Sequence, residues 1–317
     1  MTQVRDFRAD APAPDRARLA PGRTRLTEAA QGQGRTRRLR ADWRLAAVGA
    51  AVAVTAAALL VAGTVGGDGS PDRVTPGTSQ TALGDAAEVL GRAADTVERY
   101  DPVSAPGTGQ WIYEKTMSQS SGGWPGGSKE PPRTDEEWMK YADPRFENWK
   151  EGDDHSPRER FRFIQQLPDD PAELLKKARE FYPSGEGENE PRAQHDFRAL
   201  SVLLDTYPMP PEGLAKVYRA LATVPGVDVG DRLVQDVAGR DAIAVYLDVN
   251  ARANQRPEIL IDPSTYELVG QRWVVLRDYE EQYPDGETPP RPWKAGDIVD
   301  QSARLETAVV DAKGERP

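Results

Sequence analysis

The residue types that most often carry catalysis or bind metals are scarce in this sequence. Its 317 residues include two histidines, His155 and His195, and no cysteine. The lack of thiols excludes disulfides, thiolate metal sites and cysteine nucleophiles. Neither histidine belongs to a two-histidine zinc motif. Asp153 and Asp154 next to His155 could touch a cation, but such a run is more often a solvated loop, so we expect no metal and no cofactor.

Motifs for nucleophilic or phosphate chemistry are also missing. The sequence has no G-x-S-x-G elbow, no phosphate-cradling loop and no calcium loop. The glycine-rich stretch at 122–127 carries no lysine and opens no helix. The chain has 51 acidic residues, so some must lie close together by chance. An extracytoplasmic hydrolase would rest on these carboxylates alone, and we therefore predict no catalytic residues and no enzymatic activity.

Aromatic side chains offer a different kind of chemistry. Five of them fall on segments expected to be strands: Trp111, Tyr113, Trp138, Trp149 and Trp273. Aromatic residues suit half-buried pleated surfaces, so the simpler interpretation is that they form the core between sheet and helices. The functional alternative is an apolar ligand groove on a curved sheet, able to hold an acyl chain or a peptide.

Charge is unevenly distributed along the chain. The net charge is −10, yet residues 1–44 hold 11 arginines against 5 acidic residues, which leaves −16 for residues 45–317. The acidic body argues against nucleic-acid binding. The arginines of the arm are scattered and lack aromatic stacking partners. We therefore expect a basic, largely disordered cytoplasmic arm at 1–44.

The segment 45–65 is uncharged and rich in Ala, Val and Leu. As a helix its 21 residues would span about 31 Å, close to the hydrocarbon core of a bilayer. This length favours a transmembrane helix from Leu45 to Val65, with Trp43 and Arg44 at the interface. A buried core helix would be shorter or carry a polar stripe. A cleaved export signal, cut after Ala62, fits less well because 44 residues precede the apolar run.

Orientation follows from the flanks of this segment. Arginines crowd the side that precedes it, and Asp68 and Asp72 follow it. The positive-inside rule places residues 1–44 in the cytoplasm and residues 66–317 outside the cell membrane. Residues 66–80 read as a flexible Gly/Ser/Pro linker, residues 81–310 as the extracytoplasmic domain, and residues 311–317 as a disordered polar tail.

The extracytoplasmic part combines helical and strand patterns. Apolar residues recur at helical spacing in four stretches: 81–100, 170–182, 194–207 and 210–224. Asp170, Pro171 and Glu173 predict the start of the second of these helices, and Pro183 its end. Strand patterns precede and follow the last three helices, so we predict an α+β fold with an antiparallel, curved sheet packed on several helices.

Turn residues predict how the strands connect. A predicted strand at 109–118 is followed by a predicted hairpin at 136–154 that turns at Asp143-Pro144. A second hairpin turns at Gly239, and a third turns at residues 262–265.

An ordered set of motifs marks a family resemblance. The set is VRDFRADAPAPDRARLAPGRTRL, the Arg-led anchor, AAEVLGRAAD, GQWIYEKT, YRALATVPGVDV, DVAGRDAIAV and LIDPSTYELVGQRWVV. It resembles an actinobacterial family of single-pass membrane proteins of uncharacterised function, known only by a locus-tag family name. Genes of that family often lie beside extracytoplasmic-function sigma factors, which implies a regulatory role. The last hairpin is similar to the half-barrel of lipoprotein carriers and envelope-stress sensors. The turns of those relatives commonly have Gly where Tyr266 stands here. A non-glycine residue with positive φ is uncommon, so this turn departs from their pattern.

Two functions remain open from the sequence. The first is a membrane-anchored envelope sensor or anti-sigma-like regulator whose residues 1–44 fold on a cytoplasmic sigma factor. Against it, the arm lacks the His/Cys zinc pattern common in anti-sigma domains. The second is a tethered module that binds a lipid or lipoprotein through the outer domain. Both have the membrane bilayer as a partner, and neither involves nucleic acid.

Overall fold

The computed structural model describes residues 83–121, 131–148, 154–183, 190–248, 253–283 and 290–317. All of them fall in the second of the two units into which the chain divides, Met1–Leu45 and Ala46–Pro317. The predicted arm, anchor and linker, including Trp43, Arg44, Leu45 and Val65, lie outside the described residues. Within the described part, no helix has both the length and the apolar character that crossing a membrane requires.

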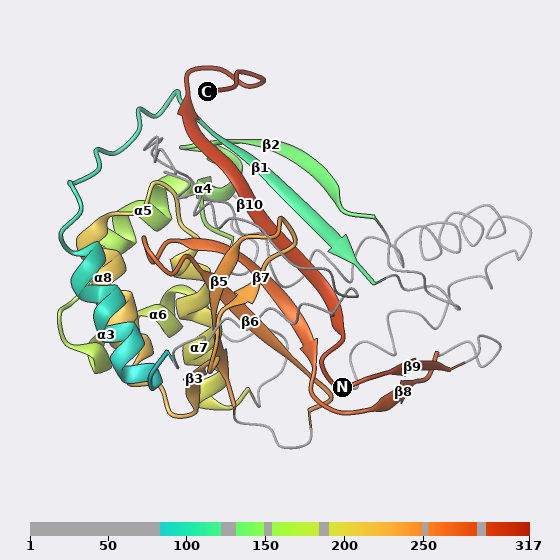
Figure 1. The fold of residues 1–317 in the computed structure, drawn as a ribbon. Helices are drawn as coiled ribbons and strands as arrows, with labels where there is room; N and C mark the ends of the chain where they lie inside the picture. The colour runs from blue at the N-terminus through green and yellow to red at the C-terminus, as the bar shows by residue number, and fades with distance from the viewer. Residues whose placement is uncertain (1–82, 122–130, 149–153, 184–189, 249–252, 284–289) are drawn as a thin grey trace, which may run out of the picture. The chain divides into compact units, whose positions relative to one another are not determined.

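The described domain is α+β, with its helices gathered on one face of an antiparallel sheet (Figure 1). The helices are α3 (Ala86–Val97), α4 (Pro144–Asn148), α5 (Pro157–Gln165), α6 (Pro171–Phe181), α7 (Arg192–Leu204) and α8 (Pro211–Leu221). The strands are β1 (Trp111–Ser120), β2 (Arg133–Lys140), β3 (Val227–Val229), β4 (Val234–Gln235), β5 (Asp241–Leu247), β6 (Gln255–Ile261), β7 (Leu268–Val275), β8 (Tyr279–Glu281), β9 (Arg291–Trp293) and β10 (Ile298–Val310).

Strand order in the main sheet does not follow the chain. The order is β2-β1-β10-β7-β6-β5-β3, with β4 also paired to β5, and every pairing is antiparallel. The short β8 and β9 form a separate ribbon. The late strand β10 therefore lies in the middle of the sheet, between the first strand β1 and the hairpin β6–β7. Figure 1 shows this long red strand beside the green β1.

One large core joins the helices to the sheet. It combines buried residues of α3, α6, α7 and α8 with the inward side chains of β5 and β6, such as Ile243, Val245 and Ile259. Alternation along a strand sends every second side chain toward the helices. A smaller cluster of Ile112, Tyr141 and Phe161 extends the core beneath β1 and α5.

Local capping explains where several helices begin. Asp170 caps α6 by accepting a hydrogen bond from the Glu173 backbone N at 2.8 Å, and Pro171 occupies its first turn, as the sequence predicts. Ser156 and Glu159 form a capping box at the start of α5, with the Glu159 side chain accepting from the Ser156 backbone N at 3.0 Å. The sequence prediction did not include this helix.

The hairpin predicted at 136–154 is wrong. Residues 133–140 form β2, which pairs with β1, and the chain then enters helix α4 at Pro144. The Asp143 side chain accepts from the Arg145 backbone N at 2.9 Å, while the Glu147 backbone N donates to the Asp143 carbonyl at 3.2 Å. Asp-Pro therefore acts here as a helix start, because proline at the first position needs no hydrogen-bond partner for its nitrogen.

The other two predicted hairpins are present. Gly239 turns the chain between β4 and β5 with φ +80°. Residues 262–265 turn it between β6 and β7, and Tyr266 adopts φ +55°. A tyrosine thus holds the left-handed conformation that glycine adopts without strain. The Tyr100 hydroxyl donates to the Thr265 carbonyl at 2.8 Å and the Tyr218 hydroxyl donates to the Tyr266 carbonyl, so two buried or half-buried tyrosines fix this turn.

Candidate functional site

A slot opens where β7 and β10 separate. The two strands pair from Ile298 to Ala303, opposite Gly270 to Val274. Gly270 allows this close approach, because a Cβ there would overlap the Ser302 carbonyl and lie 3.1 Å from the Ala303 Cα. Beyond Ala303, β10 continues along β1 with a bulge after Lys115, whereas β7 leads back into its turn at Leu268.

The slot has a volume of about 390 Å³. Its walls come from the end of α7, the start of α8, the start of β7 and the second half of β10. The lining residues are Tyr100, Leu204, Thr206, Met209, Pro211, Leu214, Arg240, Glu267, Leu268, Val269, Arg304, Leu305, Glu306, Thr307, Ala308 and Pro317. Apolar side chains dominate the helix wall, and the charged groups lie on the strand walls.

The slot borders both faces of the sheet. Thr307 pairs with Glu114, and Ala308 pairs with Tyr113. Neighbouring residues of a strand point to opposite faces. Thr307 is therefore on the helix side and Ala308 on the other side, and both line the slot.

A buried ion pair joins β10 to the end of α7 beside the slot. Arg304 of β10 donates from one nitrogen to Asp205, the residue that ends α7, and from another to the Leu268 carbonyl at 3.0 Å. Asp205 is 1% exposed. This one guanidinium thus links the helix layer to both strands that border the slot.

Several polar atoms near this ion pair lack partners. Within the described part of the chain, Asp205 Oδ2, Thr206 Oγ1 and Arg160 Nε are buried without a hydrogen bond. Thr206 is 3% exposed and lines the slot. Buried polar groups are nearly always paired in native proteins, and exceptions call for a functional explanation.

Burial shifts the pKa of three carboxyl groups at this end of the slot upward. Desolvation raises the pKa of Asp205 to about 7, although Arg304 and Arg160 oppose the shift. Desolvation also raises the pKa of Glu114 well above its usual range, and the Asp205 charge adds to that effect. Desolvation raises the pKa of Glu267, which lines the slot.

Three of the five aromatic groove candidates meet on the sheet face opposite the helices. Tyr113 of β1 pairs with Trp138 of β2, and their ring centroids are 5.2 Å apart. Trp111 lies two residues from Tyr113 on the same face. Trp273 of β7 pairs with Pro257 and Asp300, away from this group. Trp149 lies outside the described residues, and the ligand groove stays a prediction.

The segment 311–317, predicted as a disordered tail, instead contacts these aromatics. The Trp138 indole donates to the Glu315 carbonyl at 2.6 Å, and Arg316 pairs with Glu136 at 2.6 Å. Lys313 lies 5.9 Å from the centre of the Trp111 ring. The polar composition that predicted disorder here supplies the ion pair and hydrogen bonds that hold the segment on β2.

The two histidines hold the end of α6 rather than line the slot. His155 Nε2 lies 2.8 Å from the Phe181 carbonyl, and its ring stacks on Phe181. His195 Nε2 lies 2.6 Å from the Tyr182 carbonyl. Since carbonyl oxygens only accept, each Nε2 donates. Each histidine therefore satisfies a carbonyl that the helix end leaves free.

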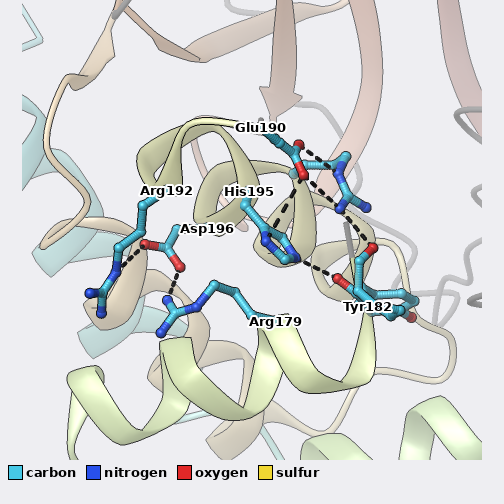
Figure 2. A network of polar contacts seen from close by, with 8 residues as sticks. Arg179, Tyr182, Glu190, Arg192, His195 and Asp196 are labelled. Carbon is cyan, nitrogen blue, oxygen red and sulfur yellow. Dashed lines mark hydrogen bonds and ion pairs between the residues drawn. The ribbon is translucent and has the colours of Figure 1, made fainter. Parts of the chain in front are cut away.

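Figure 2 shows how the same region joins α6 to α7. His195 lies between Glu190 and the Tyr182 carbonyl. Its neighbour Asp196, buried at 3% exposure, pairs with Arg179 of α6 and with Arg192, 3.9 Å away on its own helix. These contacts have a structural role. Among the described residues, no group of three or more His, Asp or Glu side chains is placed to hold a metal ion.

Comparisons with family models, curated proteins and solved structures found no match for this chain.

Sequence reasoning did not identify the slot residues. Asp205 and Thr206 end a predicted helix, and Arg304 belongs to a strand that was not predicted. The Arg304–Asp205 ion pair joins residues 99 positions apart. Residues 298–310 lack a regular alternation of apolar and polar residues, so the sequence gives little signal for β10 and none for the residues that the strand meets.

Proposed function

We propose that this protein is a single-pass cell-membrane sensor. Its extracytoplasmic domain binds a small ligand, and its cytoplasmic residues 1–44 act on a regulatory partner, such as a sigma factor. The observation that carries the proposal is the slot of about 390 Å³ between β7 and β10. Small-molecule sites are typically about 300–1,000 Å³ and combine apolar walls with a few polar groups. The slot has this size and this composition.

The contacts around the slot provide a route for a signal. Tyr100 lines the slot and donates to the Thr265 carbonyl in the strained turn. It lies three residues after α3, the first described element. Arg219 of α8 pairs at 3.2 Å with Asp95 of α3 and at 2.6 Å with Glu98, the residue that caps the end of α3. A ligand that moves the walls of the slot would therefore act on α3, which follows the linker from the proposed anchor.

Crosslinking in cells tests this function. The tagged full-length protein is crosslinked, and mass spectrometry identifies partners and the segment that carries each crosslink. We expect a sigma factor on residues 1–44. We expect Ala308→Phe, which narrows the slot from the side away from the helices, to change the amount captured, because ligand entry is obstructed. The matched control is Ala295→Phe, at an exposed turn outside the slot.

Deleting residues 1–44 can contradict the regulatory proposal. If transcription and partner capture are the same with and without these residues, the regulatory proposal is wrong. Crosslinks found only on residues 81–317 would also count against it. In that case residues 1–44 serve only to orient the protein in the membrane.

A tethered lipid- or lipoprotein-binding module is the second candidate. The apolar lining favours it, since Leu204, Met209, Leu214, Leu268 and Leu305 all border the slot. Native mass spectrometry of the full-length protein, released from its membrane, would then show a bound lipid in the wild type and lose it in Ala308→Phe. A lipid-free mass in several membrane preparations would contradict this candidate.

A further inference from the structure

Two of the carboxyl groups that line the slot have no ion-pair partner in the part of the chain that the structure describes. Its two arginines are already engaged: Arg240 pairs with the buried Asp236 at 2.7 Å, and Arg304 pairs with Asp205. Glu267 and Glu306 also line the slot, and neither forms an ion pair within the described part of the chain. Lys115 is the cross-strand neighbour of Glu306. Glu267 is therefore a partly buried carboxyl group without an ion-pair partner among the described residues, and Arg304 acts on it only through its longer-range charge.

The inner end of the slot offers further hydrogen-bond acceptors. Thr206 Oγ1 faces no partner among the described residues, and Asp205 Oδ2 behind it has none either. Both residues lie at the carboxyl end of the 13-residue helix α7. The aligned peptide dipoles make that end of a helix negative, which favours a positive charge nearby. Three separate features therefore favour a positive charge in the slot: the carboxyl end of α7, the unpaired acceptors and Glu267.

The rest of the slot would hold an apolar group. Leu204, Met209, Pro211 and Leu214 form the helix wall, next to Thr206. Burying the apolar part of a ligand there contributes about 25 cal/mol per Å². A charged ammonium group can make up to three hydrogen bonds as a donor and accepts none. It thus complements a wall that has unpaired hydrogen-bond acceptors.

We propose that the slot binds an organic cation, an amine carried on a compact apolar body. This inference rests on the proposed function, because it names the ligand class of the same site. The ammonium lies at Thr206 and Glu267, and the apolar body packs on Leu204, Met209 and Leu214.

Three probes with one apolar body test the charge preference. They are 2-phenylethylamine, 2-phenylethanol and 3-phenylpropanoate, titrated by calorimetry into the full-length protein in phosphatidylcholine nanodiscs, with empty discs as the blank. We expect the amine to bind about tenfold more tightly than the alcohol, since a charge-assisted hydrogen bond replaces a neutral one. The carboxylate should bind most weakly. Equal or tighter binding of the carboxylate overturns the proposal.

Two substitutions locate the ammonium. Glu267→Gln should weaken amine binding about fivefold to tenfold and leave alcohol binding unchanged, because only the amine uses the charge. Thr206→Val keeps the side-chain shape and removes the hydroxyl, so it should also weaken the amine selectively. The control is Glu280→Gln on β8, an exposed carboxylate outside the slot. If the control weakens the amine as much as Glu267→Gln does, the proposal is wrong.

The outcomes separate this inference from the proposed function. If all three probes bind equally and Ala308→Phe abolishes their binding, the slot is a ligand site but the amine preference is wrong. If no probe binds, the amine proposal is overturned, while crosslinking in cells still tests the sensor function independently. Selective amine binding that is lost in Ala308→Phe, Glu267→Gln and Thr206→Val supports both.

Discussion

Asp205 ends α7 and illustrates how burial controls a single charged residue. Its carboxyl group lies between the helices and the sheet, where Arg304 is its hydrogen-bond donor. Desolvation outweighs this arginine and raises the pKa of Asp205 to about 7. The same burial raises the pKa of the neighbouring Glu114. Two buried carboxyl groups around one guanidinium cannot both ionise at low cost.

Asp205→Asn should change how stability depends on pH. The unfolded pKa of Asp is about 3.9, and the folded pKa is about 7. The stabilisation from protonated Asp205 is therefore complete below about pH 4 and is lost as the pH rises toward 7. Asparagine does not titrate, so the free energy of unfolding of the variant should fall less steeply between these values. Chemical unfolding of the purified protein at several pH values measures this slope.

Asp231→Asn controls for the loss of one negative charge. The Asp231 side chain is 91% exposed, and its nearest cation, Arg232, is 4.0 Å away. The control should keep the wild-type slope. If Asp205→Asn also keeps that slope, Asp205 does not titrate between pH 4 and 7, and our account of its environment is wrong.

Glycines show how closely two helices approach each other. Gly213 lies in α8 against α5, and a Cβ there would lie 2.9 Å from the Ile164 carbonyl oxygen and overlap the Ile164 side chain. Gly91 lies in the middle of α3, and a Cβ there would meet nothing within 4 Å. The two glycines share a secondary structure and differ in packing, so they form a matched pair.

Alanine should have opposite effects at the two positions. Gly213→Ala forces α5 and α8 apart and should lower the free energy of unfolding by about 1–3 kcal/mol. Gly91→Ala should raise it by about 0.5–1 kcal/mol, because alanine loses less backbone entropy in a helix. Chemical unfolding measures both. A stabilising Gly213→Ala would show that the helices are less closely packed than described.

At the scale of the whole molecule, the main sheet depends on β10. This strand pairs with β1 on one side and β7 on the other, so it joins the two halves of the sheet. It also supplies five consecutive residues of the slot lining, Arg304 to Ala308. Without it, β1 and β7 each lose a partner and the core beneath them is exposed.

Truncation should therefore separate β10 from the segment that follows it. A chain that ends at Asp297 should lose cooperative unfolding and become sensitive to protease, because long-range pairing at the centre of the sheet is gone. A chain that ends at Val310 should still unfold cooperatively, since it loses only the surface contacts of residues 311–317. Cooperative unfolding of the shorter chain would contradict the central role of β10. Limited proteolysis and circular dichroism measure both.

The proposed membrane topology also concerns the whole molecule. The chain has no cysteine, so single cysteines can be introduced without a background. In spheroplasts, a membrane-impermeant maleimide should label Ser70→Cys directly. It should label Thr27→Cys only after permeabilisation, because the arginine-rich flank stays in the cytoplasm. Direct labelling of Thr27→Cys would contradict the proposed orientation, and the cysteine-free chain serves as the control.

Local patterns in the sequence determine most of the individual elements. Periodicity gives α3, α6, α7 and α8, and turn residues give the hairpins at Gly239 and at 262–265. These features depend on neighbours a few residues apart, which the sequence displays directly. The sequence prediction omitted the helix that begins at the Ser156 capping box. It also assigned Asp143-Pro144 to a turn, where the structure has the start of a helix.

Only the tertiary structure decides the strand order and the slot. The sequence of β10 does not specify its partner strands, and its insertion between β1 and β7 depends on packing over the whole domain. Burial then sets the chemistry of residues that look ordinary in the sequence, as with Asp205 and Thr206. The free energy of a charge or hydroxyl depends on its surroundings, and distant segments such as Arg304 provide those surroundings only after folding.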